Sequence, residues 1–213
     1  MILIPLGPPG CGKGTQAKRI ASRLGLAHLS TGDMFRAAIK DGTEMGKQAK
    51  AFIDRGELVP DSVTIGLIAD RLKAPDCQSG FILDGFPRTV AQAQALEELL
   101  KARGTPIDRV VEFQIPDQEL VGRLSGRRTC SKCGAMYHLK AAPPKKPDTC
   151  DQCGTSPLTH RSDDHSDVIK NRLNVYHQQT APLIDFYRKS GKLCTLNASL
   201  PPDQVEKQLE KFL

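Results

Sequence analysis

The sequence contains no tryptophan, and aromatic residues of any kind make up only 5% of its 213 residues. It has no apolar run long enough to span a membrane. Its short apolar start also lacks the basic leader of a signal peptide. We therefore expect a cytoplasmic protein without a membrane partner. Hydrophobic residues still account for 39% of the chain, enough to bury a full core in one domain that carries insertions.

A strong excess of one charge is also missing. Thirty basic residues oppose 24 acidic ones, giving a net charge of +6, which suits anionic ligands without indicating nucleic acid. The seven cysteines occur in a chain with no export signal. Such cysteines indicate free thiols or a metal site rather than disulfides.

The segment 6–15 has the glycines of a phosphate-binding loop. It follows an apolar run and precedes a helical pattern over 15–24, and Gly7 and Gly12-Lys13 match the P-loop spacing. Glycines let backbone N–H groups form an anion nest, and the helix N-terminus adds its dipole. Gly14 occupies the usual Ser/Thr position, and the hydroxyl follows at Thr15. The G-x-G-x-x-G pattern of dinucleotide-binding proteins is not matched.

Two helices are expected next, over 30–40 and 44–56. Ser30, Thr31 and Asp33 are candidate N-caps for the first, and Gly56 ends the second. From the residues alone, this is a helical hairpin whose Arg36 is simply solvated. An apolar run over 80–84 then ends in Asp84, where P-loop proteins bring a carboxylate close to Mg²⁺.

Three motifs together resemble those of adenylate kinases: the loop at 7–15, Ser30 to Arg36, and Asp84 to Thr89. The hydroxyl at Thr15 is a feature of that family's P-loop. The resemblance covers essentially the whole chain and implies a reversible transfer, Mg-ATP + AMP to 2 ADP, by a monomer. It implies an α/β P-loop nucleoside monophosphate kinase fold, with a parallel sheet core flanked by helices. The implied parts are a core (1–29, 60–125 and 165–213), an AMP-binding subdomain (30–59) and a lid (126–164).

The resemblance also implies residue roles. It places ATP contacts at Gly10, Cys11, Gly12, Lys13, Gly14, Thr15, Arg127, Met136, Tyr137 and Leu200. It places AMP contacts at Thr31, Arg36, Glu57, Leu58, Val59, Gly85, Phe86, Pro87, Arg88, Gln92, Arg161 and Arg172. Catalytic groups are expected at Lys13, Asp84, Arg88, Arg123, Arg161 and Arg172. The nearest alternative is a kinase for another nucleoside monophosphate, but uridylate and cytidylate kinases usually have Ala and Asn where this chain has Thr31 and Thr89.

The remaining patterns indicate a parallel α/β sheet, because strands alternate with helices. Strands are expected at 110–115 and 193–196. Helices are expected at 89–103, from Asp117, at 166–179, at 180–189 and from Asp203, with both aspartates as N-caps. Pro5 predicts a local irregularity in the first strand, since proline has no N–H for a ladder.

The segment 126–164 has almost no helical periodicity and contains two C-x-x-C pairs. Sixteen residues separate the pair Cys130 and Cys133 from the pair Cys150 and Cys153. This spacing predicts a tetrahedral Cys₄ zinc site, which leaves no open position and is therefore structural. The alternative ligands His138, His160 and Asp148 are disfavoured because four thiolates are already present. The segment resembles the long, zinc-bearing lid of some bacterial adenylate kinases.

A second class of function is an ATP-dependent nucleic-acid-binding protein with a zinc ribbon. The insert has seven basic and four acidic side chains, and a Zn(Cys)₄ centre brings its net charge close to +1. Only Tyr137 is available for base stacking, so nucleic acid is disfavoured.

Cys11, Cys77 and Cys194 remain as single thiols. Cys11 lies in the anion nest, where a helix N-terminus favours a reactive thiolate. The alternative is a small, shielded residue that fills the loop.

Overall fold

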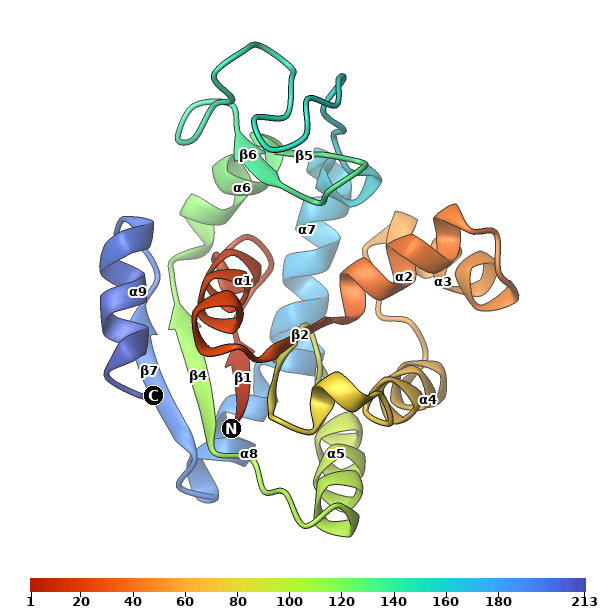
Figure 1. Cartoon of the computed structure of the whole chain (residues 1–213), viewed down its shortest axis with the longest axis vertical. Helices are drawn as coiled ribbons and strands as arrows, with labels where there is room; N and C mark the ends of the chain where they lie inside the picture. Colours follow the sequence, from red (N-terminus) through yellow and green to blue (C-terminus); the bar gives the residue numbers. More distant parts are fainter.

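The computed structural model describes all residues, 1–213, and shows a five-stranded parallel sheet covered by helices on both faces (Figure 1). The strand order is β2-β3-β1-β4-β7. The strands are β1 (Ile2–Leu6), β2 (Ala27–Ser30), β3 (Phe81–Asp84), β4 (Arg109–Gln114) and β7 (Leu193–Asn197). The predicted α/β fold class is confirmed.

The alternation of side chains along each strand divides the core into two layers. In β1, Ile2 and Ile4 belong to one buried cluster and Leu3 belongs to the other. Helices α4 (Asp61–Arg71), α5 (Val90–Ala102) and α8 (Pro182–Lys189) contribute to the first cluster. Helices α1 (Lys13–Leu24), α6 (Asp117–Ser125), α7 (Ser166–Val175) and α9 (Pro202–Glu210) contribute to the second. No helix is long and apolar enough to cross a membrane.

Two smaller groups of elements lie beside this core. Helices α2 (Thr31–Lys40) and α3 (Glu44–Arg55) pack around Phe35, Ala49 and Val59. The strands β5 (Arg127–Thr129) and β6 (Met136–His138) form a separate antiparallel pair at one end of the molecule, next to α6 and α7 (Figure 1). The 3₁₀ turns are η1 (Pro75–Cys77) and η2 (Ser162–Asp164).

Several predicted helix ends are confirmed by their caps. Ser30 accepts from the backbone N–H of Asp33, Thr89 accepts from that of Gln92, and Gly56 ends α3 in the left-handed region. The capping roles predicted for Asp117 and Asp203 are wrong. Both are in the first helical turn, behind Pro116 and Pro201, where a carboxylate stabilises the helix dipole instead.

Other differences follow from short or weak signals. Two elements were not predicted from the sequence: β2, which has only four residues, and α4, which follows Pro60. A π-helical turn, Tyr176–Thr180, joins α7 and α8 where two separate helices were expected. Strand β1 is continuous through Pro5, and the predicted irregularity is found in its pairing with the two neighbouring strands. Pairing with β3 is recorded at Ile2 and Leu3, whereas pairing with β4 continues to Leu6.

Candidate active site

A cavity of about 1250 Å³ opens where β1, β2 and β3 end. In parallel α/β proteins, ligands bind at the carboxyl ends of the strands, because the loops there carry the polar groups. All the residues predicted to be catalytic or to contact a nucleotide line this cavity except two. Cys11 and Phe86 are 2% and 1% exposed and belong to the core. The Cys₄ cluster lies outside the cavity.

The loop after β1 has the backbone conformation that its glycines allow. Gly12 is the N-cap of α1 and has φ of 97°, in the left-handed region. A Cβ at Gly10 would lie 2.8 Å from Cγ of Leu124, so a larger residue would collide with α6. The first turn of α1 contains no acidic residue, which leaves its N–H groups and dipole to an anionic ligand.

Lys13 lies across this loop rather than in solvent. Its Nζ donates to the carbonyl oxygens of Gly7, at 2.6 Å, and Pro8, at 2.8 Å. These bonds hold the ammonium group above the phosphate-binding glycines, where a phosphate oxygen could replace a carbonyl as acceptor.

Asp84 explains why the loop has Gly14 at the position where most P-loops have serine or threonine. A Cβ on Gly14 would be 2.9 Å from Oδ2 of Asp84, so a side chain there would collide with the carboxylate. Burial acts to raise the pKa of Asp84, but His28, whose Nε2 is 3.4 Å away, and Lys13 together hold it below its ordinary value. The carboxylate is therefore ionised, and it lines the cavity together with the hydroxyl of Thr15, so the two side chains offer the oxygen ligands that Mg²⁺ prefers.

Five arginines face one another across the cavity. Three of them have carboxylate partners. Arg36 donates to Asp33 at 2.6 Å. Arg127 holds Asp164 through two bonds of 2.6 and 2.7 Å. Arg172 lies 2.9 Å from Asp163 and 3.0 Å from Asp164.

Arg88 and Arg161 have no such partner. Arg88 donates to the carbonyl oxygen of Gly85, and Arg161 donates to the hydroxyl of Thr129. Burial, together with nearby arginines, lowers the pKa of each of these two guanidinium groups to about 10. Both remain charged at neutral pH, and crowded cations that have no hydrogen-bonded carboxylate are available to bind anions.

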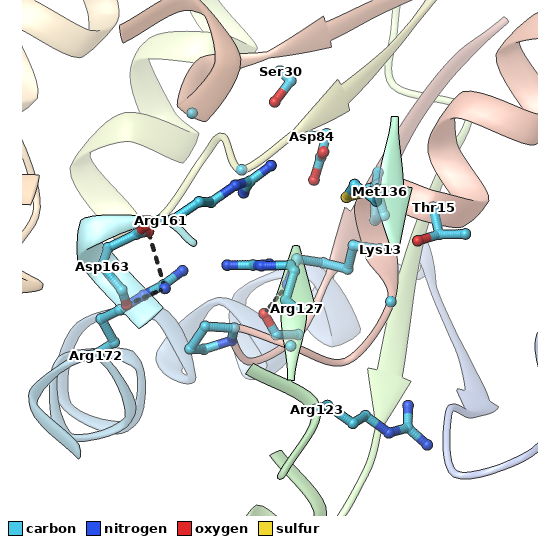
Figure 2. A pocket seen from close by; sticks show the side chains of 18 of the residues that line it. Lys13, Thr15, Ser30, Asp84, Arg123, Arg127, Met136, Arg161, Asp163 and Arg172 are labelled. Carbon is cyan, nitrogen blue, oxygen red and sulfur yellow. Dashed lines mark hydrogen bonds and ion pairs between the residues drawn. The ribbon is translucent and has the colours of Figure 1, made fainter. Parts of the chain in front are cut away.

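Arg123 is not brought together with the other arginines. Its guanidinium donates to the carbonyl oxygens of Ala198, at 2.9 Å, and Ser199, at 3.4 Å. Figure 2 shows it directed away from Lys13 and Arg161. It also lies 3.2 Å from a carboxylate oxygen of Glu119 and lines the cavity together with Leu200.

The side of the cavity formed by α2 and α3 is shaped by backbone and small polar groups. The hydroxyl of Thr31 donates to the carbonyl oxygen of Gly85 at 2.9 Å. Glu57, Leu58, Val59 and the side chain of Gln92 also line the cavity. The segments that the sequence placed in one nucleotide pocket therefore do meet.

The insert after α6 contacts both α1 and α3. Lys18 of α1 lies 3.3 Å from the carbonyl oxygen of Gly134 and 3.6 Å from a carboxylate oxygen of Asp33. Ser162 donates to Asp54 at 2.9 Å. These contacts, like that of His28, were missed at the level of sequence because no motif connects residues so far apart.

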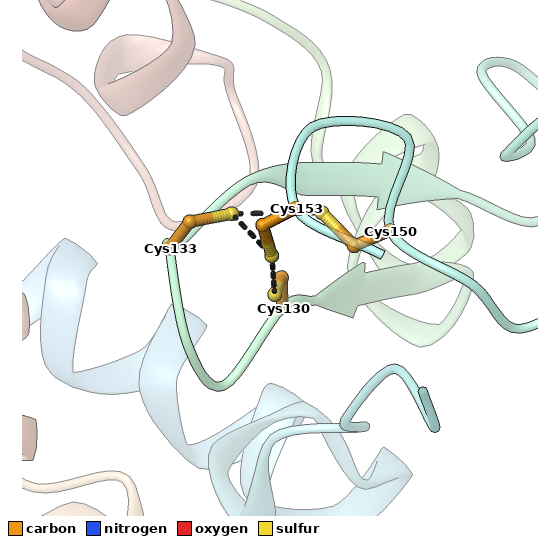
Figure 3. A group of neighbouring side chains, drawn as sticks. All are labelled: Cys130, Cys133, Cys150 and Cys153. Atoms are coloured by element: carbon orange, nitrogen blue, oxygen red, sulfur yellow. Dashed lines mark hydrogen bonds between the residues drawn. The ribbon is translucent and has the colours of Figure 1, made fainter. Parts of the chain in front are cut away.

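The four predicted metal ligands converge in the insert (Figure 3). Their sulfur atoms all lie within 4.8 Å of one another, and three pairs are separated by 3.5 Å. Zinc–sulfur bonds of about 2.3 Å in a tetrahedron give sulfur separations of about 3.8 Å, so the cluster can hold such an ion.

The alternative ligands have other roles. His138 accepts from two backbone N–H groups of the following turn, and Asp148 accepts from the N–H of Leu158. His160 packs edge-on against His165. None of the three belongs to the sulfur cluster.

Cys11 provides a test of thiol reactivity. Its side chain is 2% exposed, and this burial favours the shielded alternative. We expect brief alkylation to label the half-buried Cys194 before Cys11, with no change when ATP is added. Mass-spectrometric mapping with and without ATP decides, and rapid labelling of Cys11 that ATP prevents would show that it is a reactive thiol.

Comparison with known proteins agrees with this geometry. The family model described as adenylate kinase matches residues 5–192. An adenylate kinase from Archaeoglobus fulgidus is 52% identical over the whole chain and 98% of its own length. One from Bacillus cytotoxicus is 55% identical over 96% of this chain and 94% of its own. The P-loop, the facing arginines and the three sequence motifs thus meet in one cavity, in a chain that is similar to adenylate kinases over its full length. The chain belongs to the adenylate kinase family.

Proposed function

We propose that this chain catalyses the reversible transfer of a phosphoryl group from ATP to AMP, giving two ADP. One observation carries the proposal. Lys13 on the P-loop and the unpaired Arg88 and Arg161 line a single cavity of about 1250 Å³. A cavity of that volume accommodates two nucleotides, and its positive groups can bind the phosphate chain between them.

The reaction asks for positioning and charge rather than covalent chemistry. ATP binds with its β- and γ-phosphates on the P-loop, where the N–H groups of α1 and Lys13 stabilise negative charge. AMP binds against Thr31 and residues 57–59, with its phosphate at Arg36 and Arg88. The terminal phosphoryl group then passes between them while Arg161 and Arg172 neutralise the charge that develops in transfer.

Asp84 and Thr15 are the residues that would hold Mg²⁺ with ATP. When bound, this ion neutralises phosphate charge and orients the transferred group. Because Asp84 is ionised and held beside Gly14, the carboxylate is already placed for that task. Arg123, close to Leu200, would instead contact the base or ribose of ATP.

Two parts of the chain are proposed to move. Residues 30–59 would close over AMP, and residues 126–164 would close over ATP, excluding water that could hydrolyse it. Lys18 of α1 contacts Gly134 in the second part and Asp33 in the first. These contacts support the closed arrangement, because they hold both parts against the core.

The Cys₄ cluster is proposed to hold zinc, in a structural role. Four thiolates complete a tetrahedron and leave no position for water or substrate. The insert has a small core of Cys130, Cys150 and Leu158, so a metal ion would supply much of its stability.

The activity is tested by offering AMP, CMP, UMP and GMP with Mg-ATP in a coupled assay of ADP formation. We expect AMP to be preferred by at least about a hundredfold, since a buried pocket built for one base leaves polar groups unpaired with another. Comparable transfer to UMP or CMP would support the alternative monophosphate kinase. No transfer to any of the four would reject the proposal.

A further inference from the structure

The amide of Gln92 is held at both of its ends. This side chain is 1% exposed yet lines the cavity. Its Nε2 donates to Oδ1 of Asp61 at 2.7 Å, and its Oε1 accepts from the backbone N–H of Arg88 at 2.8 Å. One N–H and one oxygen lone pair of the amide remain for a ligand.

Asp61 is itself fixed by a second bond. Its Oδ2 accepts from the hydroxyl of Thr89 at 2.9 Å, and the same hydroxyl oxygen caps α5 by accepting from the N–H of Gln92. Asp61 lies in the first turn of α4, so it connects two helices through one carboxylate.

The two partners of the amide oppose its reversal. An ionised carboxylate only accepts hydrogen bonds, and a backbone N–H only donates one. If the amide turned over, its oxygen would face the carboxylate of Asp61 and its N–H₂ would face the N–H of Arg88. Both favourable contacts would become repulsive in a buried place, where unpaired polar groups are costly.

We propose that Asp61 is a positioning residue that sets the base selectivity of the AMP pocket by fixing the orientation of the Gln92 amide. The inference rests on the proposed function, in which the base of AMP lies against Gln92. Beyond that contact, the inference names Asp61 as the residue that prevents the amide from turning over to match another purine.

Adenine and hypoxanthine differ in the hydrogen-bonding groups that they present to this amide. Adenine presents an N6 donor beside an N1 acceptor, and hypoxanthine presents an O6 acceptor beside an N1 donor. An amide that can turn over would match either base, with its oxygen and nitrogen exchanged. An amide fixed by Asp61 and Arg88 matches one of them and repels the other.

The test compares AMP with IMP in the parent protein, in Asp61→Asn and in the matched control Asp70→Asn. Asp70 lies at the far end of α4 and pairs only with Lys73 at the surface. The asparagine side chain of Asp61→Asn can accept or donate, so that variant removes one of the two contacts that oppose reversal of the Gln92 amide and leaves only the backbone N–H of Arg88. We expect the ratio of kcat/KM for IMP to that for AMP to rise at least about tenfold in Asp61→Asn and to stay at the parental value in Asp70→Asn.

Loss of stability alone would lower the rates with both nucleotides and would leave their ratio unchanged. Each variant is therefore assayed well below its Tm, and an unchanged ratio in folded Asp61→Asn overturns the inference. A parent protein that transfers nothing to AMP rejects the proposed function, and this inference with it.

A second measurement needs no variant. Purine riboside monophosphate lacks the 6-amino group, and 1-deaza-AMP lacks the N1 acceptor. With a fixed amide, the parent protein should discriminate against IMP by more than the product of the two separate losses, because both contacts become repulsive instead of merely absent. Discrimination equal to that product, or smaller, would show that the amide adapts.

Discussion

Replacing Arg88 by alanine is expected to lower turnover by a factor on the order of 10³ or more. Its guanidinium is bonded only to the carbonyl oxygen of Gly85 and has no carboxylate partner. Burial and the nearby Arg172 lower its pKa to about 10. The protein therefore stabilises the charged form of this guanidinium less well than water does. A transferring phosphoryl group supplies the missing negative charge, so the effect should fall on kcat more than on the KM for ATP.

Arg123→Ala serves as the comparison. Both arginines follow from the sequence as catalytic groups, but Arg123 bonds to the carbonyl oxygens of Ala198 and Ser199. We expect its loss to raise the KM for ATP and to keep turnover within about tenfold of the parent. Steady-state kinetics with varied ATP and AMP measures both constants. Retention of turnover within about tenfold by Arg88→Ala would show that Arg88 does not act on the transition state.

These two arginines show how much of a functional site can be predicted from the sequence. Arg88 is within four residues of Asp84, at the end of a strand, so the local motif fixes where it lies. Arg123 is on a helix, and its direction depends on the loop at 198–200, which is 75 residues further along. Sequence can identify it as a residue of the cavity, whereas only the packed structure shows which part of the cavity it faces.

The same limit explains the residues that were missed. The pattern of the P-loop is local, and even its unusual Gly14 follows from one contact with Asp84. Asp61 instead acts through Gln92, 31 residues away, and nothing in the neighbouring sequence marks it. Strand β2 and helix α4 were overlooked for a related reason, since their order depends on pairing with β3 and packing on α5.

Loss of the metal site is expected to have the largest effect on stability. Replacing Cys130 and Cys150 by serine removes two of the four sulfur ligands that lie within 4.8 Å of one another. Structural zinc in finger peptides contributes roughly 10–16 kcal/mol of apparent binding free energy at neutral pH. If only a few kcal/mol of this is lost here, Tm should fall by about 10 °C or more for a chain of this size.

The loss should be local before it is global. The insert has three buried residues in its core, whereas the two clusters that cover the sheet have 17 and 16. Hydrogen exchange should therefore show residues 126–164 becoming unprotected while the sheet stays protected. Cys194→Ser is the matched control, because it removes a thiol outside the cluster and should retain one zinc per chain by metal analysis.

Turnover in the cold separates stability from chemistry. A zinc ion held by four thiolates would have no position for water or a phosphate oxygen, so it could not act as a Lewis acid in transfer. If the insert closes over ATP as proposed, the double variant should therefore lose much less activity at low temperature than Arg88→Ala. A double variant that keeps its Tm but is inactive in the cold would mean that the metal takes part in the reaction, because stability could then no longer account for the loss.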